Sequence, residues 1–115
     1  MPQSFVEKRP WGEFEQFDLT KVSAVKILTV NPGGELSYQY HNFRDELWIP
    51  LTEGLEFVIE GKQIRPRPFE KIFIPKKTKH RARGIGKKPA KWLEFWLGKS
   101  DESDIVRLED KYHRR

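Results

Sequence analysis

The chain has 115 residues, a formal net charge of +5, 34% charged residues and 37% hydrophobic residues. This length predicts a single domain over residues 1–115. Cysteine is absent, which excludes disulfides and thiolate metal sites. Residues 1–8 lack the apolar stretch of a secretory signal, and no later run approaches membrane-spanning length. We therefore predict a cytoplasmic protein with no membrane partner.

In chain order, the predicted elements are short strands separated by turns. Alternating apolar and β-branched residues indicate the strands, and glycine, proline and asparagine indicate the turns. The predicted strands span residues 14–18, 24–30, 36–41, 46–51, 55–60, 63–65, 71–74 and 91–97. Pro50 predicts a strand end or edge because it lacks a backbone N–H, and Gly61-Lys62 predicts a tight turn. About eight strands in one small domain predict a sandwich, jelly roll or small barrel.

The C-terminal tail has a different pattern. Ser100 or Ser103 is a typical N-cap residue, with acidic residues in the turn that follows. Ile105, Leu108 and Tyr112 then recur at helical spacing. We expect a short C-terminal helix that packs on the barrel through these three side chains.

The positive net charge has two interpretations. Basic patches bind nucleic acid, and they also hold phosphorylated small molecules. The Lys and Arg residues here are scattered between acidic residues, and no nucleic-acid module pattern is visible. We predict no nucleic-acid partner and interpret most of these side chains as a solvated face. Arg44 and Arg81 are exceptions because each lies close in sequence to a potential metal ligand.

Four residues with metal-ligand side chains form the most informative pattern, namely Gln39, His41, Glu46 and His80. Gln39 and His41 are two residues apart, so on a strand they share a face. Glu46 returns to that face after a turn, and His80 comes from a distant strand. Two imidazoles, a carboxylate and an amide oxygen suit a borderline divalent ion and leave open positions for catalysis. The alternative is that these histidines are simply packed or solvated, and spacing alone does not decide between the two.

The same stretches resemble the two motifs of cupins. The places of the first motif are occupied by Gly33, Gln39, His41, Glu46 and Gly54. Gln39 stands where that motif has its first histidine. Pro75 and His80 fit the second motif, in which Lys77 replaces a glycine. The resemblance implies an all-β fold, the cupin double-stranded β-helix or jelly-roll barrel.

A closer resemblance covers nearly the whole chain. The matching stretches include residues 9–12, 25–30, 36–41, 44–48, 80–81, 93–95 and 104–110. Over these stretches the chain is similar to the C-terminal cupin domain of bifunctional mannose-6-phosphate isomerase/mannose-1-phosphate guanylyltransferase, the type II phosphomannose isomerases. Asn42, Phe43 and Leu47 stand where the family usually has further histidines. No Gly-rich nucleotide loop is present, so guanylyltransferase activity is not transferred.

This resemblance implies an aldose–ketose isomerase that interconverts mannose 6-phosphate and fructose 6-phosphate. The implied cofactor is a divalent metal ion on the four ligand residues, and it would act as a Lewis acid. We expect zinc, with manganese, iron, cobalt or nickel as alternatives. The sugar phosphate is the expected small-molecule partner, and a homodimer is expected because dimers are common among cupins.

Four further residues receive roles under this interpretation. Arg44 is a candidate catalytic cation, because Arg clamps phosphate or stabilises an enediolate oxygen; the alternative is a surface ion pair with a nearby acid. Lys79 and Arg81 flank His80 and are candidate substrate-binding residues for the phosphate. Glu94 alternates with apolar neighbours, so it is expected to face the barrel interior as the candidate catalytic base. Its alternative role is a structural partner for an interior Arg or Lys.

Two other functions stay open. The first is a non-catalytic sugar-phosphate or nucleotide-sugar binding module that pairs with a separate guanylyltransferase chain. The second is another cupin chemistry such as nucleotide-sugar epimerisation, which typically needs no metal. The four ligand residues argue against that last possibility.

Overall fold

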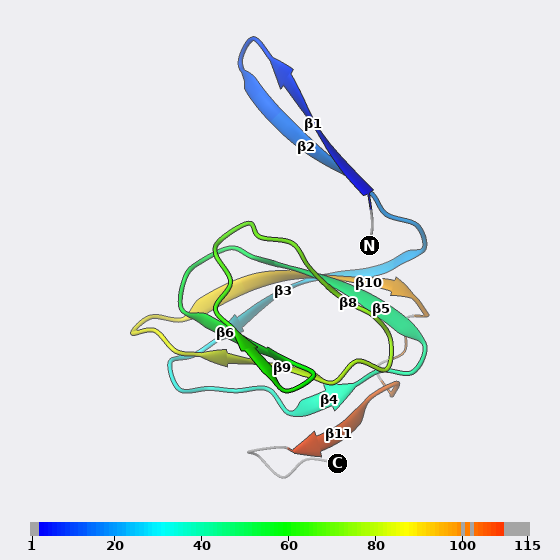
Figure 1. Cartoon of the computed structure of the whole chain (residues 1–115), viewed down its shortest axis with the longest axis vertical. Helices are drawn as coiled ribbons and strands as arrows, with labels where there is room; N and C mark the ends of the chain where they lie inside the picture. The colour runs from blue at the N-terminus through cyan, green and yellow to red at the C-terminus, as the bar shows by residue number, and fades with distance from the viewer. Residues whose placement is uncertain (1–2, 100, 102, 110–115) are drawn as a thin grey trace.

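The computed structural model describes residues 3–99, 101 and 103–109. Within this part of the chain the regular structure consists of β-strands, which confirms the predicted all-β class. The strands, shown in Figure 1, are β1 (Gln3–Arg9), β2 (Gly12–Asp18), β3 (Val22–Val30), β4 (Tyr38–Tyr40), β5 (Arg44–Pro50), β6 (Leu55–Ile59), β7 (Lys62–Ile64), β8 (Ile72–Ile74), β9 (His80–Gly84), β10 (Ala90–Gly98) and β11 (Val106–Glu109).

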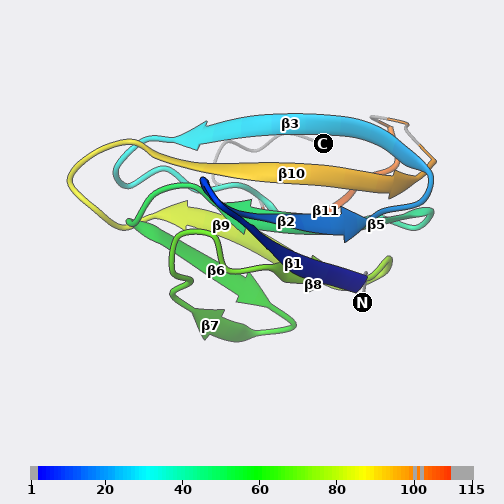
Figure 2. The same cartoon turned by 90° about the horizontal axis from the view of Figure 1, so that it is seen from above.

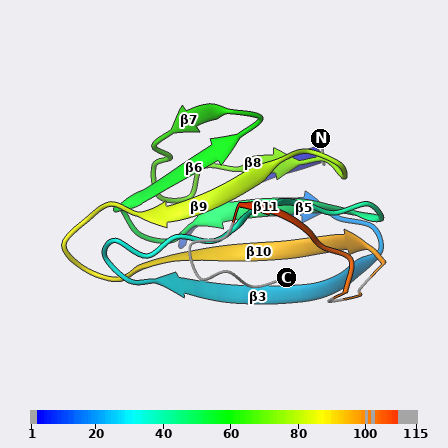
Figure 3. The same cartoon turned by 90° about the horizontal axis from the view of Figure 1, so that it is seen from below.

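Two antiparallel sheets face each other and form the barrel. The first has the order β3-β10-β5-β8, and the second has the order β11-β4-β9-β6-β7. In Figures 2 and 3, β3 and β10 lie on one side of the barrel, and β6 and β7 lie on the other. Apart from the β6–β7 hairpin, neighbours in the two sheets are distant in sequence, as when Trp96 of β10 pairs with Glu46 of β5. This pairing brings separate parts of the chain to the space between the sheets.

The space between the sheets is apolar at one end and polar at the other. The apolar end is filled by Val30, Trp48, Leu55, Phe57, Ile72, Ile74, Ala82, Ala90 and Trp92. The Trp48 ring centre lies 4.8 Å from that of Phe57 and 5.4 Å from that of Trp92. Along β10 the inward positions then change from Trp92 to Glu94, and along β5 from Trp48 to Glu46. The aromatic core therefore supports a row of buried polar side chains.

The backbone conformation tests two predictions, one about a strand end and one about a tight turn. Pro50 is the last residue of β5, which confirms the predicted strand end. The turn between β6 and β7 consists of Glu60 and Gly61, one residue earlier than predicted, because Ile59 pairs with Lys62. Both turn residues have positive φ, 48° and 77°, as a two-residue hairpin turn requires.

The predicted C-terminal helix is wrong for the described residues. Residues Val106–Glu109 form strand β11, which pairs with β4 through Val106↔Tyr40 and Arg107↔Gln39. The exposed edge of β4 supplies hydrogen-bonding groups to the tail, and this tertiary pairing overrides the helical spacing of Ile105 and Leu108. Ser103 lies in a turn, where its backbone N–H and hydroxyl both bond to Asp101 Oδ1. Ser100 and Tyr112 lie outside the described residues.

The β1–β2 hairpin stands clear of the barrel (Figure 1). All seven residues of β1 are exposed. An ion pair of 3.1 Å between Lys71 Nζ and Glu15 Oε2 connects the hairpin to the segment before β8. The described residues contain no helix of the length and apolarity needed to cross a membrane.

Candidate metal centre and active-site cavity

Three of the four predicted metal ligands meet in the barrel interior. His41 follows β4, Glu46 lies on β5 and His80 begins β9. Their side chains are only 4%, 1% and 1% exposed. One ligand atom from each lies within 4.8 Å of the others, so the three form a group that can hold a metal ion.

Both imidazole rings are fixed by backbone carbonyl groups. His41 Nδ1 lies 2.6 Å from the carbonyl oxygen of Asp104, and His80 Nδ1 lies 2.8 Å from that of Thr78. A carbonyl oxygen only accepts, so each Nδ1 carries the proton and donates it. Burial lowers the pKa of both histidines, against the attraction of the nearby Glu46 carboxylate. The rings are therefore neutral near pH 7, and each Nε2 carries a lone pair.

The Glu46 carboxylate is held from two sides. Arg44 Nε donates to Glu46 Oε2 at 2.8 Å, and Trp48 Nε1 donates to Glu46 Oε1 at 2.7 Å. Burial alone would raise the pKa of Glu46, but the two histidines and these two hydrogen bonds hold it below its ordinary value. Glu46 is thus an ionised carboxylate in the interior.

These three side chains fit a divalent cation. His41 Nε2 lies 3.2 Å from Glu46 Oε2, and His80 Nε2 is buried without a hydrogen-bond partner. A lone pair facing a carboxylate is repulsive unless a cation lies nearby. Ligand atoms about 2.1 Å from a shared ion lie roughly 3.0–3.4 Å from each other, which matches the His41–Glu46 spacing. Arg44 already supplies one positive charge near this lone pair and carboxylate, because its Nη2 lies 3.3 Å from His41 Nε2.

Gln39, the fourth predicted ligand, lies beside this group. It is paired directly with His80 across β4 and β9, so the two side chains share a face. Its Oε1 accepts a hydrogen bond of 2.8 Å from Ser37 Oγ. The structure therefore brings Gln39 to the neighbourhood of the histidines, and its ligation of a metal stays a prediction.

A cavity of about 150 Å³ opens beside the metal-ligand group. Its polar wall includes the predicted residues Gln39, His41, Arg44 and Glu94. Two cationic residues that the sequence analysis did not single out, Lys26 and Arg107, line the same cavity. Lys26 lies on β3 between the outward-facing Val25 and Ile27, so alternation along the strand places it on the face opposite to these two residues.

Glu94 lies in the interior, as the alternation along its strand predicts. Trp96 Nε1 donates to its Oε1 at 2.7 Å, and Trp92 Nε1 donates to its Oε2 at 3.3 Å. Burial, followed by the charge of Glu46, raises the pKa of Glu94 to about 7. A carboxyl group with this pKa can both accept and release a proton near neutral pH.

Arg44 is buried, with 5% of its surface exposed, so the alternative of a surface ion pair is wrong. Besides Glu46, its Nη1 donates to the carbonyl oxygen of Asp101 at 3.2 Å. The guanidinium carbon lies 3.5 Å from the centre of the Trp96 ring. Arg44 thus contacts both a candidate ligand and the C-terminal segment, and it forms part of the cavity wall.

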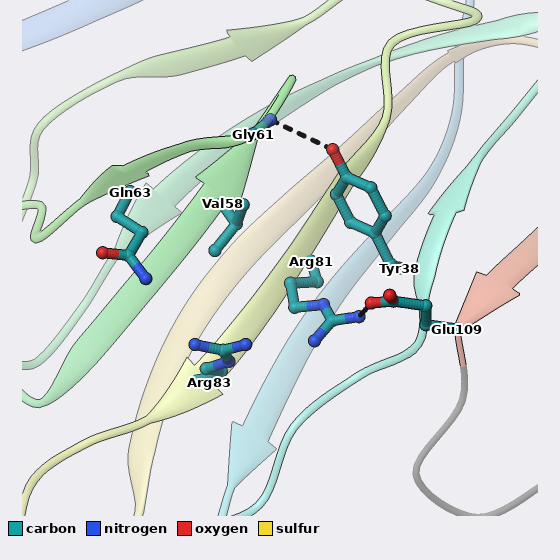
Figure 4. A pocket seen from close by; sticks show the side chains of 7 residues that line it. All are labelled: Tyr38, Val58, Gly61, Gln63, Arg81, Arg83 and Glu109. Atoms are coloured by element: carbon teal, nitrogen blue, oxygen red, sulfur yellow. Dashed lines mark hydrogen bonds and ion pairs between the residues drawn. The ribbon is translucent and has the colours of Figure 1, made fainter.

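The structure does not bring Lys79 and Arg81 to this cavity. Successive side chains on a strand point to opposite faces, so His80 points inward and its two neighbours point outward. Lys79 is exposed, and Arg81 Nη2 donates to Glu109 Oε2 at 2.7 Å. Arg81 lines a separate pocket on the outer side of the second sheet, together with Tyr38, Val58, Gly61, Gln63, Arg83 and Glu109 (Figure 4).

Comparison with known proteins gives relatives over nearly the whole chain. The chain is 36% identical over 107 residues to the xanthan biosynthesis protein XanB of Xanthomonas campestris pv. campestris (strain B100), covering 92% of this chain and 23% of that protein. It is also 36% identical over 107 residues to the mannose-1-phosphate guanylyltransferase ManC of Salmonella typhimurium (strain LT2), covering 92% of this chain and 22% of that protein. The chain thus spans about a quarter of the length of these relatives.

A solved structure establishes the fold. It is a conserved Klebsiella pneumoniae protein with a double-stranded β-helix domain, and it superimposes with a TM-score of 0.67 at 15% identity. The match covers 95% of this chain and 85% of that one. The predicted cupin jelly roll is therefore confirmed. The sequence model described as Mannose-6-phosphate isomerase C-terminal matches residues 3–110. This chain belongs to the mannose-6-phosphate isomerase C-terminal family.

Proposed function

We propose that this chain is a metal-dependent isomerase that interconverts mannose 6-phosphate and fructose 6-phosphate. The observation that carries the proposal is a cavity lined both by His41 of the His–Glu–His group and by Glu94, a carboxyl group with a pKa raised to about 7. Aldose–ketose isomerisation moves one proton between C1 and C2, and it makes a sugar oxygen transiently negative. The cavity combines a group that can move the proton with cations that can stabilise the charge.

His41, Glu46 and His80 would hold the metal, with Gln39 as the additional ligand. A divalent ion, zinc in this proposal, would supply Lewis acidity toward the sugar oxygens. Arg44 keeps Glu46 oriented through the 2.8 Å hydrogen bond and adds a positive charge to the cavity wall. That charge stabilises the enediolate oxygen, because it acts in a buried site of low dielectric.

Glu94 is the proposed base. Its two indole donors fix the carboxylate, and its raised pKa leaves a large fraction protonated near pH 7. The ionised form removes the proton from one sugar carbon, and the protonated form returns it to the neighbouring carbon. The same group therefore serves both halves of the isomerisation.

Lys26 and Arg107 are the proposed phosphate ligands, in place of Lys79 and Arg81. Both line the cavity and come from strands on either side of it, β3 and β11. The cavity is smaller than the roughly 300 Å³ of common ligand pockets. Entry of a sugar phosphate therefore requires the segment that carries Ile105 and Arg107, which forms part of the wall, to move outward.

The decisive experiment is a coupled assay for fructose 6-phosphate formation from mannose 6-phosphate. Activity should disappear with a chelator and return with added zinc, and unphosphorylated mannose should be a poor substrate. Glu94→Gln should abolish turnover while metal binding persists. Lys26→Met should raise KM for mannose 6-phosphate, and the matched variant Lys79→Met should leave KM unchanged because Lys79 lies outside the cavity.

The second candidate is a non-catalytic module that binds a sugar phosphate or nucleotide sugar for a separate guanylyltransferase chain. The observation that favours it is the name of one relative, because ManC, which matches 92% of this chain, is named as a mannose-1-phosphate guanylyltransferase. Protein that retains metal and binds mannose 6-phosphate by calorimetry, yet shows no turnover under any metal loading, would establish this candidate and refute the isomerase.

A further inference from the structure

We propose that the pocket on the outer side of the second sheet, the outer pocket of Figure 4, is a second ligand site. It takes a small hydroxylated carboxylic acid, and it releases strand β11 from the sheet when it is filled. The site is separate from the metal-ligand cavity, and its assignment does not rest on the isomerase reaction. Two observations carry it, namely an incompletely bonded arginine at the centre of the pocket and a bulge in β11.

The outer pocket follows one row of side chains across the second sheet. The row crosses β7, β6, β9, β4 and β11 in that order and consists of Gln63, Val58, Arg81, Tyr38 and Glu109. Tyr38 reaches back over the sheet to the β6–β7 turn, where its hydroxyl accepts a hydrogen bond of 3.0 Å from the N–H of Gly61. The short Val58 side chain leaves a hollow of about 310 Å³ between its larger neighbours (Figure 4). This volume falls within the range of ordinary small-molecule pockets.

Arg81 is the buried cation of this pocket, and its side chain is only 9% exposed. Among the described residues its one hydrogen bond runs from Nη2 to Glu109 Oε2, at 2.7 Å. Its Nη1 lies 3.7 Å from Glu35 Oε1, which is beyond hydrogen-bond distance, and its Nε is buried without a partner. A buried guanidinium with unused donors is suited to bind a carboxylate at two points.

The carboxylate that now contacts Arg81 can be exchanged for another. The Glu109 side chain is 71% exposed and belongs to β11, an edge strand of the sheet. An ion pair with so exposed a partner is weak, because water screens the charges. The 2.7 Å contact shows that Arg81 accepts a carboxylate from the open side of the pocket. A ligand carboxylate would therefore take the place of the Glu109 carboxylate.

The charges around the pocket favour a carboxylate over a phosphate. Arg83 is already held by Glu35 at 2.9 Å and by Glu56 at 3.2 Å, so its charge is balanced. Replacing the Glu109 carboxylate by one ligand carboxylate leaves the net charge at Arg81 unchanged. A phosphate dianion would add a further negative charge beside Glu35 and Glu56, which repel it.

The rest of the pocket suits a hydroxylated carbon ring. Val58 and the ring of Tyr38 give it an apolar floor and side wall. The Tyr38 hydroxyl accepts from Gly61 and has no acceptor for its own proton among the described residues. The exposed Gln63 amide can both donate and accept. Apolar contact below and hydrogen bonds at the edge are what the body of a sugar acid requires.

A bulge in β11 connects the outer pocket to the metal-ligand cavity. The register shifts between Arg107, which pairs with Gln39, and Glu109, which pairs with Tyr38. Two side chains that would otherwise share a face are thereby turned to opposite faces. Arg107 lines the metal-ligand cavity, and Glu109 lines the outer pocket. A ligand that displaces Glu109 from Arg81 therefore loosens a strand that forms part of the cavity wall.

Binding is tested by calorimetry on the full chain, with glucuronate as the probe. We expect saturable binding, and we expect glucose and glucose 6-phosphate to compete at least about 10-fold less well. Arg81→Gln should weaken glucuronate binding by roughly 10-fold or more, because it removes the charged donor. Val58→Trp, which fills the hollow and keeps every charge, should do the same.

Two control variants locate the binding. Arg65→Gln removes an exposed arginine of the same sheet that does not line the outer pocket, and Lys26→Met alters the metal-ligand cavity. Both should bind glucuronate like wild type. Circular dichroism should show that every variant folds, and Val58→Trp carries the test if Arg81→Gln does not fold.

The release of β11 is tested by hydrogen exchange. Saturating glucuronate should speed amide exchange in Val106–Glu109 by up to about fivefold, which is the strength of an exposed ion pair. Glu109→Gln should speed it to the same extent without ligand. The same variant should bind glucuronate up to about fivefold more tightly, because the internal competitor for Arg81 is gone.

Three results would overturn the proposal or one of its parts. Absence of saturable binding, or binding that survives both Arg81→Gln and Val58→Trp, would refute the outer pocket as a ligand site. Tighter binding of glucose 6-phosphate than of glucuronate would refute the carboxylate. Unchanged exchange in β11 at saturating glucuronate would refute the release of the strand.

Discussion

The Nδ1 atom of His41 lies 2.6 Å from the backbone carbonyl oxygen of Asp104, a residue 63 positions further along the chain. The Asp104 carboxylate also accepts hydrogen bonds from the backbone N–H groups of Asn42, at 2.8 Å, and Phe43, at 2.9 Å. One residue of the C-terminal segment therefore fixes the ring of a candidate metal ligand and the loop that follows it. Such outer contacts set the tautomer and orientation of a ligating histidine.

Asp104→Ala is expected to weaken metal binding by about 10–100-fold, because the loop after His41 loses both carboxylate contacts. The two unpaired N–H groups should also lower the free energy of unfolding by roughly 1–3 kcal/mol. Titration with zinc in a competing chelator measures the first effect, and urea denaturation measures the second. Glu53→Ala, which removes an exposed carboxylate, is the control. Unchanged zinc affinity in Asp104→Ala would remove this residue from the support of the site.

His80→Ala is expected to abolish metal binding. His80 Nε2 is buried without a hydrogen-bond partner and belongs to the group that can hold a metal ion. Elemental analysis after metal loading and dialysis should give close to one ion per chain for wild type and close to none for the variant. Lys79→Ala, the exposed neighbour, should keep the metal. A wild type that retains no ion under any loading condition would contradict the assignment.

Glu94→Gln should alter how stability depends on pH in metal-free protein. The folded-state pKa of Glu94 is raised from its ordinary 4.5 to about 7, so between these values the folded state binds more protons than the unfolded state. This group therefore makes the protein less stable as the pH rises through that window. The variant should lose this contribution, so its decline in unfolding free energy from pH 5 to pH 8 should be smaller by roughly 2–3 kcal/mol.

Denaturant unfolding in chelator at the two pH values measures this difference. Glu53→Gln provides the matched control, because Glu53 is exposed. Equal pH dependence in wild type and Glu94→Gln would mean that Glu94 titrates normally, and it would weaken its assignment as the base.

Arg44→Lys should reduce turnover much more than stability. Lysine keeps the charge but loses the planar fork that reaches both Glu46 and the Asp101 carbonyl oxygen. We expect kcat/KM to fall by roughly 100-fold or more, with a Tm decrease of only a few degrees. Arg65→Lys, at a side chain that is 75% exposed, should behave like wild type. Normal kinetics in Arg44→Lys would remove Arg44 from the mechanism.

Local sequence patterns were sufficient for much of the fold and for the centre of the site. Strand period and turn residues predicted most strands of the two sheets, because a half-buried strand leaves an alternating pattern in its own sequence. His41 and Glu46 could be placed on one face because they are near each other in the chain. His80 was connected to them by its resemblance to a second motif, and cross-strand pairing with Gln39 gives this its physical basis.

Long-range pairing decided the rest. Alternation shows that Lys26 and Val25 point to opposite faces, but both faces of β3 carry apolar residues, so only the assembled barrel shows that Lys26 lines the cavity. Arg81 differs in this respect, because it follows the inward-facing His80 on β9 and alternation by itself places it on the outer side.

The C-terminal segment shows the physical reason most clearly. Its helical spacing is a weak local preference, whereas pairing with β4 satisfies backbone hydrogen bonds on both strands and places Asp104 against His41. The sequence by itself thus determined most of the strands, although not β1, β9 or β11, and it determined the types of ligand. The tertiary structure decided which cationic side chains lie close to the metal ligands. The reason is that a strand's inward face is defined only when the strand pairs with partners that are distant in sequence.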